Sequence, residues 1–345
     1  MNVSIAICKD PYCGWHERFA EALAKYSTNC TAFKFEIIDI DAHDWMDSCM
    51  DSDVIIFKPS VLGVEAAQHY KEKILFIEAH LNKLVFPNYN TIWHYESKIA
   101  QSYLFKYYSI RTPDTFVSFE YHDTCKFLDS ASWPLVFKES YGAGGSKVKL
   151  IKDRLQAQKA VNSRFASQLW REYKLLLRKA KYLSLLFHPW FWQKVFVSVS
   201  GRSPFNSIYL QEFVPNNSRD LRVTVIGGRY AYAFWRLNRK NDFRASGSGN
   251  IDYASEIPEA PILYCINISK ELGFDSMAYD LVYKDNEFTI IEMSCVYSDC
   301  ALFNAKGYWR AEHDLLKWIP GNHWPQSVWI AALMEKLSLQ LSCHT

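Results

Sequence analysis

The sequence predicts a mixed fold of the α/β (α+β) class, with a small N-terminal α/β domain followed by two α+β units. Strand-like and helix-like apolar patterns alternate along the first 90 residues. A glycine-rich loop at 141–146 separates two short apolar runs near the middle of the chain. Two hairpin patterns follow in the last third. We place the three parts at residues 1–90, 91–210 and 211–345.

The composition is that of an ordinary globular protein. The 345 residues suffice for two or three domains, and 49% of them are hydrophobic against 22% charged. A net charge of +2 gives no reason to expect nucleic acid as a partner. Nine scattered cysteines include no CxxC pair, which predicts reduced thiols and neither a zinc site nor a disulfide framework. Neither a signal-peptide pattern nor an apolar run of about 18 residues occurs, so we expect a cytoplasmic protein.

The N-terminal elements follow from their apolar spacing. Val3, Ile5 and Ile7 alternate with smaller residues, as in a short strand, and the pattern changes to helical spacing after residue 15. A later helix, Thr91–Tyr108, is expected to end before Pro113, because proline cannot continue a helix. The other predicted elements are the strands Asn2–Cys8, Phe33–Ile40 and Val54–Lys58 and the helix Trp15–Tyr26.

The later elements are predicted in the same way. A glycine turn at Gly227 and Gly228 joins two strands, and an amphipathic pattern predicts a packing helix near the end of the chain. The predicted strands are Pro134–Lys138, Lys147–Lys152, Ser207–Phe213, Leu221–Ile226 and Arg229–Trp235, and the predicted helices are Leu155–Phe187 and Gln326–Leu341.

Two carboxylates stand out in the hairpin at 280–294. If the loop has about three residues and is centred on Asn286, Asp280 lies directly opposite Glu292 on one face. Opposed like charges destabilise a strand pair. A two-residue loop would instead place them on different faces. A hard cation such as Mg²⁺, which takes one or two carboxylates together with phosphate oxygens, would turn the repulsion into attraction.

Two further segments could contact phosphates. Lys138 ends an apolar strand, and glycines in the loop after it let backbone N–H groups approach phosphate oxygens closely. A plain hairpin loop is the alternative. Lys98 lies inside the predicted helix and, taken alone, is a solvated helix lysine. The loop residues concerned are Gly142, Gly144, Gly145 and Ser146.

Two polar segments follow along the chain. The strand ending at Gln211, Glu212, Phe213 and Val214 can offer backbone groups to a flat ligand, with Asp220 and Arg222 beyond a proline turn. An ordinary crossover with a surface ion pair is the alternative. A basic run follows, whose guanidinium groups suit phosphate or carboxylate oxygens unless it is simply a solvated loop. It contains Arg236, Arg239, Lys240 and Arg244.

The order of these segments resembles the ATP-grasp superfamily of ATP-dependent ligases. The closest branch is the one that contains the glutamate ligases acting on ribosomal proteins and on peptides. The resemblance covers about residues 90–300 and rests on several segments agreeing in order and spacing. It implies an ATP-grasp fold, in which two α+β subdomains clasp ATP.

The resemblance also implies a role for each segment. Lys98 and Lys138 would hold the phosphates, and the Gly142–Ser146 loop would close over them. The strand at Gln211–Val214 would meet adenine, chiefly through the backbone of Glu212 and Val214. Asp220 would bind the ribose. Two Mg²⁺ ions, or Mn²⁺ in their place, would be bound by Asp280, Glu292 and Ser294. The transferring phosphoryl group would be stabilised by Arg222, Arg236 and Arg244.

The implied reaction joins a carboxylate to an amine in two steps. A carboxylate attacks the γ-phosphate of ATP to give an acyl phosphate and ADP, and an amine then displaces phosphate. The family usually has asparagine where Ser294 stands, and a hydroxyl is a weaker Mg²⁺ ligand. Two other functions stay open, an ATP-grasp-like kinase and a nucleotide-binding module without catalysis.

The substrate is suggested only by the segment 152–207, which holds eleven lysines and arginines against two acids and includes three tryptophans. Such a segment can lie on an anionic membrane surface, at the inner face of the membrane, or bind an anionic substrate. A helical subdomain with a solvated basic face is the alternative. The acid could be a small molecule, a glycan or a peptide, joined to an amino acid or another amine. The sequence gives no firm indication of the oligomeric state.

Overall fold

The computed structural model describes residues 3–10, 13–27, 33–58, 64–141, 147–165, 206–313 and 315–342. These residues form two compact units. The first unit comprises the described parts of Met1–Thr112 and Asn216–Thr345, and the second comprises those of Pro113–Gly142 and Ser146–Pro215. The three-part division expected from the sequence stays a prediction. Among the described residues, no helix is long and apolar enough to cross a membrane.

The first unit begins with a parallel sheet of four strands in the order β2-β1-β3-β4. The predicted alternation of strands and helices in this region is confirmed. Both faces of its inner strands, β1 and β3, are packed, as is usual for parallel strands. The strands are β1 (Val3–Cys8), β2 (Phe33–Ile38), β3 (Val54–Ile56) and β4 (Leu84–Phe86), and the helices between them are α1 (Trp15–Ser27), α2 (Trp45–Met50) and α3 (Val64–Ala79).

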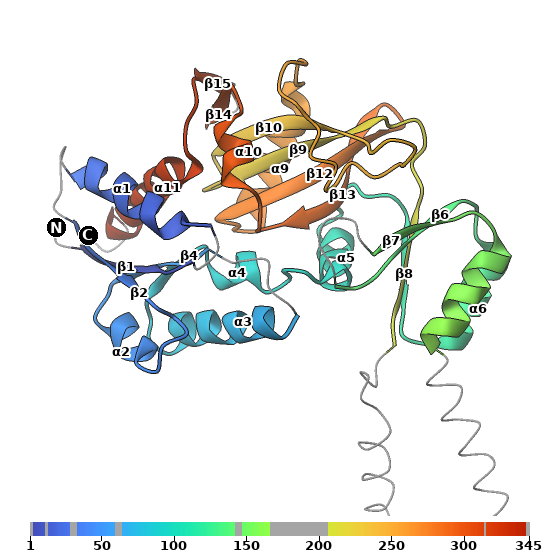
Figure 1. Ribbon diagram of the computed structural model, residues 1–345, viewed down its shortest axis with the longest axis horizontal. Coiled ribbons are helices and arrows are strands. Elements are labelled where there is room, and N and C mark those ends of the chain that lie inside the picture. Colours follow the sequence, from blue (N-terminus) through green and yellow to red (C-terminus); the bar gives the residue numbers. More distant parts are fainter. Residues whose placement is uncertain are drawn as a thin grey trace, which may run out of the picture. The chain divides into compact units, whose positions relative to one another are not determined.

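A seven-stranded sheet forms the rest of the first unit, with β9 between β10 and β12 (Figure 1). Its neighbouring strands are antiparallel. The strands are β9 (Arg219–Ile226), β10 (Tyr230–Leu237), β11 (Ile251–Asp252), β12 (Ser276–Lys284), β13 (Glu287–Ser294), β14 (Gly307–Glu312) and β15 (Leu315–Pro320). The helices are α9 (Glu259–Glu271), α10 (Asp299–Phe303) and α11 (Pro325–Ser342).

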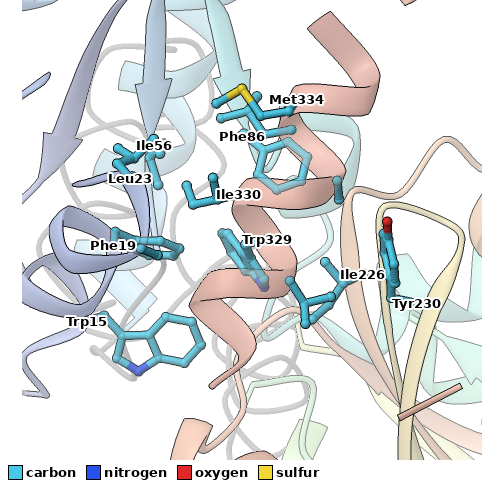
Figure 2. Packing of buried hydrophobic residues seen from close by; sticks show 14 of the residues in the cluster. Trp15, Phe19, Leu23, Ile56, Phe86, Ile226, Tyr230, Trp329, Ile330 and Met334 are labelled. Atoms are coloured by element: carbon cyan, nitrogen blue, oxygen red, sulfur yellow. The ribbon is translucent and has the colours of Figure 1, made fainter. Parts of the chain in front are cut away.

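Helix α11 joins the cores of the two sheets. Its Trp329 is buried, and the Trp329 ring lies 5.3 Å from that of Phe19 on α1 and 5.4 Å from that of Phe86 on β4. Figure 2 shows the same indole between Phe19 and Ile226 of β9. The predicted packing helix at the end of the chain is therefore confirmed, and it fixes the first sheet against the seven-stranded one.

The turn between β9 and β10 is one of the contacts of α11. Gly227 has a left-handed φ of +60°, and an added Cβ would lie 2.5 Å from the Cβ of Ala332. We expect Gly227→Ala to lower the free energy of unfolding by about 2–4 kcal/mol, through overpacking and backbone strain together. Chemical denaturation measures this loss. Gly249→Ala is the matched control, because Gly249 has φ +73° but open space around it. Equal losses in both variants would contradict the packing explanation.

The predicted helix Thr91–Tyr108 is wrong, because two helices with a break between them occupy this region. α4 (Tyr89–Ile92) ends early, and α5 (Lys98–Tyr107) begins anew. Glu96 adopts a left-handed φ of 61°, and the Ser97 side chain caps α5 by accepting from the backbone N–H of Ala100 at 3.2 Å. A serine at this position starts a helix more readily than it continues one.

His94 lies in this break and is fully buried, with its ring 5.2 Å from that of Phe274. Burial lowers the His94 pKa to about 3, and Lys71 adds to the effect. The unfolded chain therefore binds the proton more tightly between pH 6.5 and 3. The contribution of His94 to the free energy of unfolding is therefore complete above pH 6.5. Below pH 6.5 the free energy of unfolding falls by up to about 1.4 kcal/mol per pH unit. In denaturation at several pH values, His94→Phe should flatten this dependence, whereas the exposed His69→Phe should keep the wild-type slope.

The second unit contains an antiparallel sheet of four strands in the order β5-β8-β6-β7, with its own core. The predicted strands around the glycine-rich loop and before residue 213 are confirmed. Residues 154–165 are helical, and most of the basic segment, 166–205, lies outside the described residues. The elements are β5 (Thr115–Ser118), α6 (Tyr121–Ser130), β6 (Leu135–Lys138), β7 (Val148–Ile151) and β8 (Ile208–Glu212).

Candidate active site

The hairpin of β12 and β13 brings the two predicted carboxylates together. Its turn consists of Asp285 and Asn286, both left-handed, so the expected loop of about three residues is one residue too long. Ile291 is the extra residue of the register, because it lies between two consecutive pairs, Leu281 with Ile290 and Asp280 with Glu292. This β-bulge shifts the strand by one residue and restores the predicted pairing of Asp280 with Glu292.

Asp280 belongs to a buried chain of alternating charges across three strands. Its Oδ1 accepts from Arg222 Nε at 2.8 Å, and its Oδ2 accepts from Arg222 Nη2 at 2.9 Å. Arg236 Nη2 lies 2.7 Å from Asp280 Oδ2. Arg236 also donates from Nε and Nη2 to both oxygens of Asp220, at 2.7 and 2.6 Å. We call these four residues, Arg222, Asp280, Arg236 and Asp220, the ion chain.

Strand register explains how the ion chain forms. On β9, Asp220 and Arg222 are two residues apart and therefore point to the same face. The antiparallel neighbours place Arg236 of β10 opposite Asp220 and Asp280 of β12 opposite Arg222. Opposite charges directly across a strand pair stabilise it. Both guanidinium groups are thus held in fixed orientations by bidentate contacts.

The charges of the ion chain are set by these contacts. Burial raises the pKa of Asp280, but Arg222 and Arg236 outweigh it and lower the pKa to about 2. Asp220 contacts one guanidinium instead of two, and its burial leaves its pKa above the ordinary value. Burial disfavours the charged form of Arg236, yet the two aspartates raise its pKa. Asp280 and Arg236 therefore keep their charges at neutral pH.

Lys98 and Glu292 form a second charged group. Lys98 is the first residue of α5 and not an interior one, and its Nζ lies 3.1 Å from Glu292 Oε1. Gln101, one turn later, bonds both backbone groups of Met293, donating to its oxygen at 2.8 Å and accepting from its nitrogen at 3.2 Å. The N-terminal end of α5 is thereby fixed beside Glu292, where its dipole favours anions.

A cavity of about 270 Å³ borders both charged groups. Five predicted site residues line it: Arg222, Arg236, Asp280, Glu292 and Ser294. The sequence did not indicate Glu96 and Tyr297, which line it as well, because neither has a recognisable sequence pattern. Ser298 could have been found, since it caps α10 by accepting from the N–H of Ala301. Apolar side chains complete the lining: Phe234, Ile251, Val296, Ala301 and Leu302.

The basic run after β10 contributes its loop to the cavity. Residues 245–249 are among the lining residues, and Arg244 is not. Arg244 Nε donates to both oxygens of Asp242 at 3.0 and 2.9 Å, and Arg239 Nη2 donates to the backbone oxygen of Ser246 at 2.6 Å. Both arginines thus hold the loop in place in the described structure.

The remaining predicted residues belong to the second unit. Lys138 is buried at the end of β6, and its Nζ lies 5.8 Å from the Tyr209 ring centre. Gln211 is also buried and donates to Thr115 Oγ1 at 3.0 Å. The Glu212 N–H donates to Asp114 O at 2.8 Å, and Phe213 and Val214 are half-buried. The predicted loop residues Gly142, Gly144, Gly145 and Ser146 lie outside the described residues.

The donor set suits Mg²⁺ only in part. No group of three or more metal-ligating His, Cys, Asp or Glu side chains occurs among the described residues, so phosphate oxygens would have to complete the shell. Glu292 fits best, since its side chain is 30% exposed at the cavity. Asp280 is buried, and both its oxygens already accept from guanidinium groups. The Ser294 hydroxyl donates to Val296 O and accepts from Val296 N.

Comparison with known proteins extends these observations. No family model matches the chain. The curated α-aminoadipate–LysW ligase LysX of Saccharolobus solfataricus is 22% identical over 222 residues, which cover 64% of this chain and 69% of LysX.

Several solved structures are similar to nearly the whole chain. A RiPP-associated ATP-grasp ligase of Chryseobacterium gregarium, in complex with ADP and a leader and core peptide, matches with a TM-score of 0.57, 12% identity and 97% coverage of both chains. The macrocyclase MdnC of Microcystis aeruginosa MRC, bound with precursor peptide MdnA, matches with a TM-score of 0.57, 11% identity and coverage of 97% and 100%. A RimK domain protein ATP-grasp of Sphaerobacter thermophilus gives a TM-score of 0.53, 14% identity and coverage of 84% and 90%.

Proposed function

We propose that this chain, which has the ATP-grasp fold of the structures it resembles, is an ATP-dependent carboxylate–amine ligase. The observation that carries the proposal is the ion chain beside Glu292 and Lys98 at one cavity. It presents two guanidinium groups in fixed orientations, next to a carboxylate that can bind metal. Such an arrangement suits the transfer of a phosphoryl group to a substrate carboxylate.

The proposed roles follow from the contacts. Arg222 and Arg236 stabilise the charge on the transferring phosphoryl group and on the acyl phosphate. Lys98 and the N-terminal end of α5 hold phosphate oxygens. We assign Asp220 to holding Arg236 rather than to binding ribose, because both its oxygens accept from that guanidinium. Bound Mg²⁺ would neutralise phosphate oxygens, with Glu292 as its main protein ligand and smaller contributions from Asp280 and Ser294.

Two classes of substrate acid are compatible with the proposed reaction, a peptide carboxylate and a glycan acid. A peptide carboxylate is supported by the leader, core and precursor peptides named for the Chryseobacterium gregarium ligase and for MdnC. A glycan acid stays the second alternative, together with contact of residues 152–207 with an anionic membrane surface. In either case an amino acid is a suitable amine.

Trapping of the acyl phosphate tests the proposal. The protein is incubated with Mg·ATP, hydroxylamine and pooled carboxylic acids, which include peptides and uronic acids. We expect ADP and hydroxamate to form together, since hydroxylamine takes the place of the amine. Both products should be lost in Glu292→Gln and kept in Glu287→Gln, whose carboxylate lies at the far end of β13 and pairs with Arg111 at 2.6 Å.

Two results would contradict the proposal. ADP with a stable phosphorylated product and no hydroxamate would establish a kinase. ATP binding without ADP release, across the acid pools, would favour a binding module.

A further inference from the structure

The first sheet ends in an exposed strand, β2. Lys34, Phe35, Glu36 and Ile37 are exposed, with 36% of Phe35 and 48% of Ile37 accessible. On the side away from β1, no strand of the described chain pairs with β2. An edge strand with exposed apolar side chains and no proline is a template for another strand.

The backbone of β2 shows which residues can pair outward. The Ile38 oxygen accepts from the Lys9 nitrogen at 2.8 Å, so the backbone groups of Ile38 point toward β1. These groups alternate in direction along a strand. Lys34 and Glu36 therefore share the direction of Ile38, whereas the backbone N–H and C=O groups of residues 33, 35 and 37 point to the free edge.

We propose that two copies of this chain associate through antiparallel pairing of their β2 strands, with the twofold axis at Phe35. Phe35 then pairs with Phe35 of the second copy, and Phe33 pairs with Ile37 at both ends. All these residues have outward backbone groups, so each pair exchanges two hydrogen bonds. The two four-stranded sheets become one sheet of eight strands, in a closed isologous dimer.

Charge complementarity supports this register. Lys34 lies opposite Glu36 of the second copy, and this pair occurs twice. The two pairs are of the kind without mutual hydrogen bonds, in which side chains approach most closely. Two other pairings of the β2 strands also place the outward backbone groups of residues 33, 35 and 37 opposite one another, and each is shifted by two residues from the proposed one. One places Lys34 opposite Lys34, and the other places Glu36 opposite Glu36, and both are destabilised by like charges.

The other face of the strand pair is apolar. Phe35 and Ile37 share a side with Ile5 and Ile7 of β1, which pack in the core below α1. In the dimer, Phe33, Phe35 and Ile37 of both copies form one continuous row. A ladder of five residues on each side is small for a stable interface, so the dimer should be reversible and depend on concentration.

Charge reversal tests the proposal with the full chain. Sedimentation velocity over a range of protein concentrations should show a monomer–dimer equilibrium for the wild type. Lys34→Glu and Glu36→Lys each oppose like charges twice and should weaken the dimer by about tenfold or more. The double variant K34E/E36K restores opposite charges in both copies and should return the dissociation constant to within about threefold of the wild type.

A backbone variant tests the pairing itself. Phe35→Pro removes an N–H that points to the free edge and leaves the bonds to β1 intact, so it should abolish the dimer. Thermal unfolding of each variant at low concentration, where the protein is monomeric, verifies that the fold is kept. A wild type that stays monomeric, single variants that dimerise normally, or a double variant that does not recover would each overturn the proposal.

Discussion

Replacing Arg236 with lysine is expected to lower the rate of ADP release by about 10²–10³-fold, as loss of a positioned donor does in other active sites. Lysine keeps the positive charge between Asp220 and Asp280 but cannot donate to both carboxylates through a rigid fork. The remaining charge is therefore misplaced relative to the phosphoryl group. Steady-state measurement of ADP should show the loss in kcat rather than in KM for ATP.

Stability and a matched arginine separate this effect from misfolding. Arg236→Lys should cost about 1–3 kcal/mol of unfolding free energy, because it leaves buried carboxylate oxygens short of donors. Arg310→Lys is the control, since Arg310 lies on β14, outside the ion chain, and forms a half-buried pair with Glu312 at 3.6 Å. A folded Arg236→Lys protein with wild-type kcat would show that the ion chain is structural only.

Glu292→Gln is expected to reduce ADP release by at least about 10²-fold and to raise the Mg²⁺ concentration needed for half-maximal rate. The amide keeps the size of the side chain but loses the charge that attracts the cation and pairs with Lys98. The rate is measured against Mg²⁺ concentration at saturating ATP.

Comparison of the Mg²⁺ requirements of Asp280→Asn and Glu292→Gln shows which carboxylate is the main metal ligand. Asp280→Asn should lose kcat and stability, since both arginines are held by that carboxylate, and should change the Mg²⁺ requirement less. If Asp280→Asn instead shifts the Mg²⁺ requirement more than Glu292→Gln does, Asp280 is the main metal ligand, and an arginine must leave it when metal binds.

Local sequence patterns predicted most helices and strands, but the register between strands that are far apart in the sequence could not be predicted. The contact of Asp220 with Arg236 follows from the short turn at Gly227, since the register set by that turn places the two residues opposite each other. The contact of Arg222 with Asp280 depends on the pairing of β9 with β12, which are far apart in the sequence. No pattern near either residue encodes that pairing.

One local expectation was wrong for an identifiable reason, and a second concerns a residue that does not line the cavity. The helix predicted over 91–108 does not take into account the capping signal of Ser97, whose side chain accepts from the N–H of Ala100 and begins a new helix. The resemblance to the ATP-grasp superfamily implies the same role for Arg244 as for Arg236, and that role of Arg244 stays a prediction. In the structure Arg244 pairs with Asp242 in the loop after β10, whereas Arg236 lies within the strand itself. Closeness in sequence does not ensure a shared site once a strand ends between two residues.

The bulge at Ile291 allows Asp280 and Glu292 to lie opposite each other although the number of residues between them does not fit a regular hairpin. A hairpin closed by a two-residue turn pairs only positions separated by an odd number, whereas Asp280 and Glu292 have an even separation. Parity therefore requires one extra residue on one of the two strands, and Ile291 is that residue. Deleting Ile291 would leave an uninterrupted ladder with both carboxylates still opposed. A hairpin one residue shorter would therefore keep the same opposed pair of carboxylates.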